Sequence, residues 1–119
     1  MDPAAVVMVR VIAYLRPHKL EGVKAAVTSL GISGMSVADV RGTGASEEPA
    51  TWFAGQETVV AMPIKSRLEM IVPADLAEPV VQAIVEHART GEPGDGKIFL
   101  EPIEDAIRIR TLERGVDAV

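Results

Sequence analysis

The sequence predicts an α+β fold in which two helices cover one face of a single antiparallel sheet. Runs of β-branched and aliphatic residues, which suit strands, alternate with two stretches of helical periodicity. Glycine and proline residues separate these runs, and a length of 119 residues fits one domain, 1–119. Hydrophobic residues make up 48% of the chain and aromatic residues only 3%, so the core must be aliphatic.

The first half of the chain predicts a strand, a helix and a second strand. Residues 1–6 are expected to be a short extension, and 7–15 form an aliphatic strand. Pro17 suits the first turn of a helix, and Gly31 suits the position just after its end. The helix is indicated by apolar residues at helical spacing, namely Leu20, Val23, Val27 and Leu30. Residues 32–41 predict the second strand.

A long loop is predicted over residues 42–57, where several glycines, Pro49 and two adjacent glutamates interrupt the pattern. Loops of this length are usually functional or mobile. Residues 58–72 predict a third strand, with a bend near Pro63.

The second half predicts another helix and further strand. The helix is expected over 74–89, although Pro79 implies either a later start or a kink. A glycine-rich turn follows over 90–96, and then 97–100 and 103–110 predict strand.

A polar, flexible tail is expected over 112–119. The predicted elements therefore follow one another in the order β, α, β, long loop, β, α, β. This is the ferredoxin-like βαββαβ arrangement, with both helices on one sheet face. The other face needs a cover, and in a chain this apolar a second copy is a natural candidate.

Composition argues against several classes of function. A net charge of −5 and four aromatic side chains (Trp 1, Tyr 1, Phe 2) disfavour nucleic-acid binding. Cysteine is absent, which excludes disulfides and thiolate metal sites, and neither histidine has a second ligand at metal spacing. Without an apolar run of membrane-spanning length or a signal-like N-terminus, we expect a cytoplasmic protein with no membrane insertion.

The turn around Gly91, Gly94 and Gly96 is the most informative segment for chemistry. Glycines permit a positive φ, and successive N–H groups in such a turn can form an anion-binding nest beside Lys97. The run is not a phosphate loop of the NTPase type, because Ile98 stands where that motif needs Ser or Thr and a strand follows.

Arg108 and Arg110 alternate with two isoleucines, so a strand would place both guanidinium groups on one face. Together with Lys97 they offer about the charge needed for a di- or triphosphate. An ordinary turn and a solvated strand edge remain the alternatives on this pattern alone.

Several motifs resemble those of the PII signal-transduction family. Thr90–Phe99 and Ile107–Thr111 resemble the family's C-terminal signature, Arg16–Leu20 resembles its basic-Pro-Phe-Lys-Leu motif, and Gly31–Val37 resembles its Gly-Ile-x-Gly-Met-Thr-Val motif. The resemblance continues without a gap from about Val9 to Thr111.

The resemblance implies a homotrimer of ferredoxin-like subunits that binds ATP or ADP in clefts between neighbours. The segment 42–57 would be the T-loop, which reports the ligand to a protein partner. The residues implied near the nucleotide are Ser36, Gly44, Glu69 and Ile71, and at the phosphates Gly94, Asp95, Gly96, Lys97, Arg108 and Arg110, one arginine coming from a neighbouring subunit.

The T-loop departs from the family pattern. Ser46 replaces the glutamine that chelates Mg²⁺, and Ala45 replaces an arginine that contacts phosphate. Glu47 and Glu48 should repel a triphosphate, which favours ADP or AMP over Mg²⁺-ATP. We therefore do not expect the usual Mg²⁺-ATP and 2-oxoglutarate response. Phe53 stands where many members have the tyrosine that is uridylylated and has no hydroxyl, so we expect no uridylylation.

Two further positions carry expectations. Lys65 matches the family's lysine for the oxoglutarate carboxylate, with an ordinary surface ammonium as the alternative. Trp52 and Phe53 would form an apolar tip of the T-loop for a partner.

The sequence thus predicts a non-enzymatic regulator of an enzyme or transporter, in nitrogen or in carbon and bicarbonate metabolism. We predict no catalytic residue, no metal site and no catalytic cofactor. One alternative is a phosphate-chemistry enzyme on the same fold, for which Asp95 is the candidate base. The other is a metal-tolerance trimer.

Overall fold

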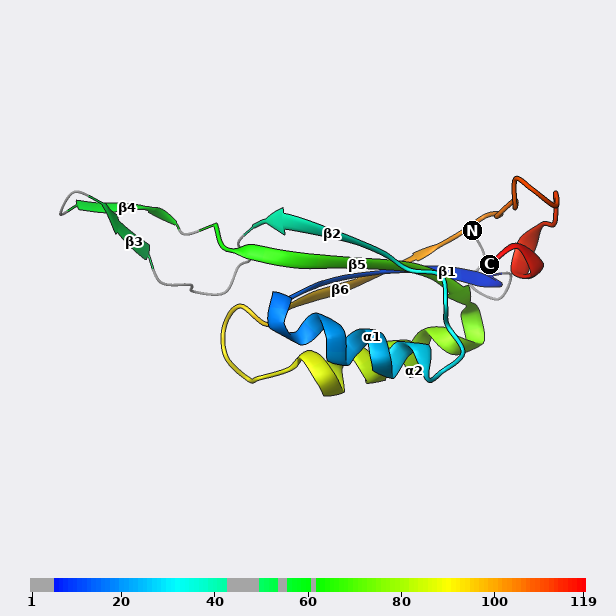
Figure 1. Ribbon diagram of the computed structural model, residues 1–119, viewed down its shortest axis with the longest axis horizontal. Helices are drawn as coiled ribbons and strands as arrows, with labels where there is room; N and C mark the ends of the chain where they lie inside the picture. Colours follow the sequence, from blue (N-terminus) through cyan, green and yellow to red (C-terminus); the bar gives the residue numbers. More distant parts are fainter. Residues whose placement is uncertain (1–5, 43–49, 54–55, 61) are drawn as a thin grey trace.

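Strand β1 (Met8–Leu15) lies inside a four-stranded antiparallel sheet of order β2-β5-β1-β6 (Figure 1). The other strands are β2 (Ser36–Arg41), β5 (Ile64–Pro73) and β6 (Gly96–Pro102). The computed structural model describes residues 6–42, 50–53, 56–60 and 62–119, and of 50–60 it describes only the backbone. This strand order and the helices between the strands confirm the predicted ferredoxin-like fold.

Helices α1 (Leu20–Thr28) and α2 (Ala74–Ala88) cover one face of the sheet (Figure 1). The short 3₁₀ helix η2 (Pro17–Lys19) leads into α1. Strand residues with period two point their apolar side chains at the helices, which gives an aliphatic core. Its fully enclosed members include Val11, Leu15, Val23, Val27, Leu68, Val72, Val80 and Ile84.

The opposite sheet face carries charged side chains from three strands. Arg10 of β1 pairs with Glu69 of β5 and with Glu101 of β6, and Arg67 also pairs with Glu69. Phe99 lies on the same face as Tyr14, with their ring centroids 6.2 Å apart, and it is half exposed. This face therefore combines ion pairs with apolar surface that the chain itself leaves uncovered.

The segment that joins β2 to β5 contains more strand than predicted. Strands β3 (Ala50–Phe53) and β4 (Gln56–Val60) pair as a hairpin beyond the end of the main sheet (Figure 1). The loop predicted over 42–57 is therefore partly strand, and the third strand begins at Ile64, after Pro63, rather than at residue 58. Likewise β2 begins at Ser36 rather than at residue 32, because the chain leaving Gly31 at φ +90° has not yet reached the edge of β5.

Helix α2 begins at Ala74, directly after Pro73, so a later start is wrong. Pro79 lies inside the helix, where it can donate no hydrogen bond to the preceding turn. The helix persists because its buried side chains pack on the sheet. In the described part of the chain, no helix combines the length and apolar character that a membrane crossing requires.

The prediction of a strand over 103–110 is wrong. Strand β6 ends at Pro102, which pairs with Val9 and has no N–H to extend the ladder. Beyond it the chain folds back on itself through a turn in which Leu112 has φ +64°, and an isolated bridge joins Ile107 to Arg114.

The tail expected over 112–119 contains regular structure. The 3₁₀ helix η3 (Gly115–Ala118) follows that bridge, and Gly115 N–H donates to the Ala106 carbonyl at 3.0 Å. We call residues 103–119 the C-terminal segment.

Candidate functional site

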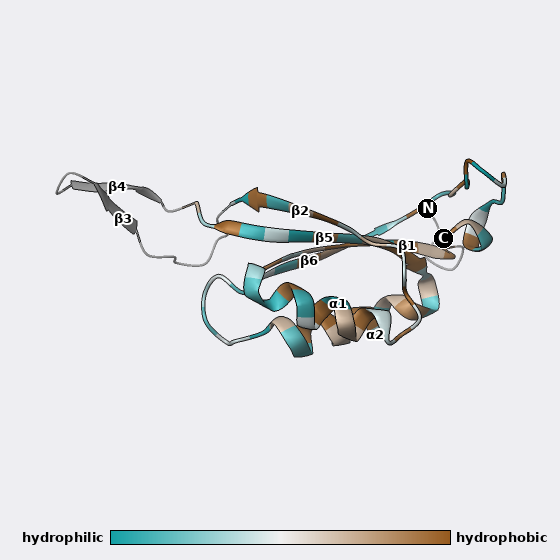
Figure 2. Cartoon of the chain, in the orientation of Figure 1, coloured by the Kyte–Doolittle hydropathy of each residue, from teal (hydrophilic) through white to brown (hydrophobic). Residues whose placement is uncertain are grey.

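The turn that joins α2 to β6 is shaped by glycines. Gly94 has φ +97° and Gly96 has φ +106°, where side chains are rarely tolerated. A Cβ at Gly96 would lie 1.7 Å from the Tyr14 carbonyl oxygen, so no other residue fits there without moving the backbone. The main chain of the turn therefore lies directly against the end of β1. The residues of the turn are hydrophilic (Figure 2).

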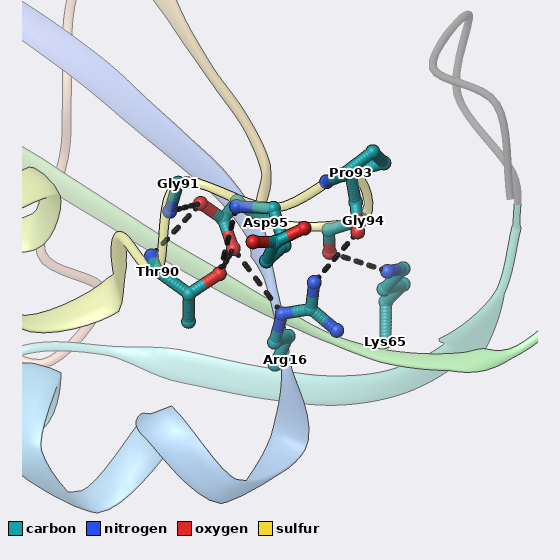
Figure 3. Close-up of polar contacts among 8 residues, drawn as sticks. Arg16, Lys65, Thr90, Gly91, Pro93, Gly94 and Asp95 are labelled. Carbon is teal, nitrogen blue, oxygen red and sulfur yellow. Dashed lines mark hydrogen bonds and ion pairs between the residues drawn. The ribbon is translucent and has the colours of Figure 1, made fainter.

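Asp95 is the centre of the hydrogen bonding in this turn (Figure 3). Its carboxylate accepts from the N–H groups of Thr90 and Gly91, both at 2.9 Å, and from the Thr90 hydroxyl. The Nε of Arg16 donates to the same carboxylate at 3.2 Å. The Thr90 hydroxyl, the two N–H groups and Arg16 hold the pKa of Asp95 well below its usual range, despite some desolvation. Asp95 is thus a structural acceptor and is poorly suited to act as a general base.

Two cationic side chains, which come from the end of β1 and from β5, donate hydrogen bonds to backbone carbonyl groups of the turn. Arg16 Nη2 donates to the Pro93 carbonyl at 2.7 Å, and Lys65 Nζ donates to the Gly94 carbonyl at 2.6 Å (Figure 3). Lys65 is only 8% exposed, so the expectation of an ordinary surface ammonium is wrong. These contacts fix two carbonyl groups of the turn, those of Pro93 and Gly94.

Sequence reasoning assigned no role to Arg16 or Thr90. The sequence does contain a signal for their role: Thr90 and Asp95 stand at the two ends of a Gly-Glu-Pro-Gly run. Such residues close turns by hydrogen bonding to nearby backbone N–H groups.

Lys97 lies at the start of β6, opposite Tyr14 in the register. Its side chain is exposed and makes no ion pair with any residue that the structure describes. A groove of about 380 Å³ passes beside it, between the C-terminal half of α2 and the end of β1, and Asp95 and Gly96 also contribute to its lining. The predicted phosphate residues Gly94, Asp95, Gly96 and Lys97 are therefore together.

A second groove, of about 620 Å³, contains the residues expected near the base. Ser36 and Glu69 are register partners in β2 and β5, and Ile71 follows on the same face of β5. Arg108 also lines this groove, with its Nη1 3.5 Å from the Glu113 carboxylate. The sequence pattern predicts that Arg108 lies with the phosphate residues, whereas within one chain it lies with the residues expected near the base.

These two places are apart on the sheet, because Lys97 belongs to β6 and Ser36 to β2, the strands at its two edges (Figure 1). Lys97 pairs with Tyr14, and Ile71 pairs with Arg10, which is roughly 13 Å away along β1 at a strand rise of about 3.3 Å per residue. Arg110 belongs to the exposed turn of the C-terminal segment, so its expected alternation with Arg108 on a strand face does not occur. One chain therefore contains both sets of residues but does not bring them together.

Some predicted positions fall outside this description. Gly44 lies outside the described residues, and for Trp52 and Phe53 only the backbone, in β3, is described. Among the residues described, no group of three or more His, Cys, Asp or Glu side chains gathers as metal ligands would.

Comparison with known proteins gives consistent matches over nearly the whole chain. A family model described as nitrogen regulatory protein P-II matches residues 8–113. The chain is 45% identical to a nitrogen regulatory protein P-II of Rhodobacter capsulatus and 44% identical to one of Nostoc punctiforme, each over 94% of this chain and all of the relative. The corresponding protein of Haemophilus influenzae is 41% identical over the same shares.

A solved structure, that of Arabidopsis thaliana PII bound to citrate, superposes with a TM-score of 0.80. It is 38% identical, and the match covers 98% of this chain and 96% of that one.

Proposed function

Because the chain belongs to the nitrogen regulatory protein P-II family of signal-transduction regulators, we propose that it binds an adenine nucleotide between two copies of itself. Its relatives are named as regulatory proteins, and the chain is accordingly a regulator rather than an enzyme. In this proposal, ADP or AMP binds at least as well as ATP, and residues 42–57 report the bound ligand to an enzyme or transporter.

The observation that carries the proposal is the separation of the two half-sites. The glycine turn with Lys97 is suited to phosphate, and the groove with Ser36, Glu69 and Ile71 is suited to a base. The two lie apart on one sheet, with Lys97 on the edge strand β6 and Ser36 on the opposite edge strand β2. A ring of copies, each set beside the next with its uncovered sheet face inward, would join one chain's phosphate half to its neighbour's base half. A homotrimer is the assembly that we propose.

The phosphate half has the properties that a polyphosphate requires. Gly94 and Gly96 have positive φ values, and in turns of this kind successive backbone N–H groups can form an anion site together with a nearby cation. Lys97, with no partner in the described part of the chain, supplies that cation. Citrate, which is bound in the Arabidopsis relative, is itself a polyanion and supports an anion-binding role for the fold.

The base half offers what a purine requires, which is an apolar slot with polar groups at its edge. Ile71 and Met35 supply apolar surface, while the Ser36 hydroxyl and the Glu69 carboxylate can accept hydrogen bonds from an amino group. Arg108 would complete the phosphate contacts once a neighbouring chain brings its glycine turn to this groove.

A carboxylate effector at Lys65 would have to share an ammonium that already donates to the Gly94 carbonyl and is only 8% exposed. This contact, together with Ser46 in place of the family's glutamine, is why we propose a weak or absent 2-oxoglutarate response.

Isothermal titration calorimetry with ADP, AMP and ATP, with and without Mg²⁺, tests the proposal. We expect saturable binding without turnover, one site per chain, and at least about tenfold weaker binding for Lys97→Ala, since a charge-assisted contact is worth roughly 1.5–3 kcal/mol. Lys24→Ala is the matched control, because Lys24 is on α1, far from both grooves, and pairs only with Glu21 among the described residues. A trimer by native mass spectrometry that gives no heat with any adenine nucleotide would defeat the proposal.

A further inference from the structure

The groove of about 380 Å³ beside Lys97 is more apolar than a phosphate site needs to be, and we call it the α2 groove. Aliphatic side chains line it on the helix side and on the sheet side, namely Leu15, Val81, Ile84, Val85, Ala88 and Ile98. Val85 is 41% exposed, so the chain itself leaves part of this apolar surface open. Phosphate oxygens make no favourable contact with such side chains, and the aliphatic lining therefore has no task in the proposed nucleotide site.

Two cationic side chains border the same groove. Arg89 directly follows α2, where its N–H donates to the Val85 carbonyl at 3.0 Å, and Lys97 belongs to the sheet side. Both side chains are exposed, and neither forms an ion pair with any residue that the structure describes. The acidic residue of the lining, Asp95, already accepts four hydrogen bonds. The α2 groove thus combines aliphatic walls with positive charge that the described part of the chain does not neutralise.

This combination matches a ligand that carries both a hydrocarbon chain and an anionic group. A bare phosphate would leave the aliphatic walls uncovered, and a neutral hydrocarbon would shield the two cations from water without giving them a counter-charge. A carboxylate at the end of an aliphatic chain supplies both contacts, because ammonium and guanidinium groups form charge-assisted hydrogen bonds with carboxylate oxygens. The volume of the groove is near the lower end of the range for small-molecule sites, about 300–1,000 Å³, so a short chain suits it.

We propose that the α2 groove binds a short linear aliphatic monocarboxylate. Its carboxylate contacts Arg89 and Lys97, and its hydrocarbon chain lies along Val81 and Val85. This site goes beyond the proposed function and does not depend on it, because it needs neither a nucleotide nor the base half.

Isothermal titration calorimetry of the wild-type protein with butanoate, hexanoate and octanoate tests whether the aliphatic walls bind the chain. We expect the affinity to rise about twofold to fourfold for each added CH₂ group, as burial of apolar surface predicts. Hexanamide has the same chain without the charge, and we expect it to bind at least about fivefold more weakly than hexanoate.

Two variants separate the apolar contact from the charged one. Val85→Ser should weaken octanoate binding about fivefold and butanoate binding less, whereas Arg89→Gln should weaken all three acids alike and reduce the preference for hexanoate over hexanamide. Val37→Ser and Arg41→Gln are the matched controls and should leave binding unchanged. Val37 is 44% exposed and Arg41 is exposed, both belong to β2, and neither lines the α2 groove.

Three results would overturn the proposal. The first is an affinity that does not depend on chain length or on charge in the wild type. The second is equal weakening by Val37→Ser and Val85→Ser, which would indicate unspecific uptake on exposed apolar surface. The third is a natively melting Val85→Ser protein that binds the acids normally but loses its oligomeric state in native mass spectrometry, because a second copy would then cover the groove. A protein that binds no adenine nucleotide would leave this proposal standing.

Discussion

Arg16 and Asp95 are joined by an ion pair of 3.2 Å between the end of β1 and the glycine turn, 79 positions apart in the sequence. The same guanidinium donates to the Pro93 carbonyl, so one side chain holds two points of the turn. This pairing braces the glycine turn of the phosphate half, where Asp95 also lines the groove.

Arg16→Ala should therefore loosen the turn while the sheet stays folded. We expect the free energy of unfolding to fall by about 1 kcal/mol, because both contacts are partly exposed. Urea denaturation at pH 7 measures this, with Lys24→Ala, which breaks an exposed pair with Glu21, as the control that should change little. Identical unfolding curves for Arg16→Ala and the wild type would contradict the bracing role.

Gly96→Ala should be among the most damaging small substitutions in the chain. The added methyl group would meet the Tyr14 carbonyl at 1.7 Å, and φ is +106°, so the turn or the end of β1 must move. We expect a loss of about 3 kcal/mol or more in stability, measured by chemical denaturation. Gly91→Ala is the control, since it has φ +90° but nothing within 4 Å of the new methyl group, and it should cost only about 1 kcal/mol.

The low pKa of Asp95 predicts how stability depends on pH. A carboxyl group whose pKa is lowered on folding stabilises the protein at pH values above its unfolded pKa of about 3.9, and this contribution is lost as the pH falls below that value. The melting temperature of the wild type should therefore fall more steeply between about pH 4 and 2 than that of Asp95→Asn. Parallel melting curves over this window would show that Asp95 does not make the expected contribution.

Glu113→Gln should strengthen anion binding at the base half of the site. Glu113 lies 3.5 Å from Arg108, and its charge competes with any phosphate that approaches that guanidinium. The pair is well exposed, so we expect only about a twofold to threefold gain in ADP affinity by calorimetry. Glu21→Gln, which removes the same charge from α1, is the control and should leave the affinity unchanged; a loss of affinity in Glu113→Gln would count against the competition.

Periodicity predicted the main elements of the fold well, because their side chains follow one rule along each segment. Val23 and Val27 in α1, or Leu68 and Val72 in β5, carry the core in just the spacing that helix and strand require. The family motifs indicate that Gly94 to Lys97 act as one group, which stays a prediction, and Asp95, Gly96 and Lys97 line one groove.

The failures arose where tertiary contacts decide the conformation. Alternation over Ile107 to Arg110 suits a strand, but among the described residues no strand pairs with it beyond the single bridge from Ile107 to Arg114. The bonds from Asp105 to Arg114 and Gly115 hold the segment folded back instead. The burial of Lys65 could not be foreseen, since its partner is a backbone carbonyl 29 positions away. Nor does a sequence pattern reveal that Arg108 lies with Ser36 and apart from Lys97.

Strand β5 links the two halves of the proposed site. Lys65 at its beginning holds the Gly94 carbonyl, and Ile71 near its end lines the base groove, roughly 20 Å along the same extended backbone. In a closed ring, each such strand would border two different ligands, one at either end. A ligand bound in one cleft would then contact a strand that also lines the next cleft. Binding at one cleft would therefore change the affinity of its neighbour, and the clefts of the ring would be coupled.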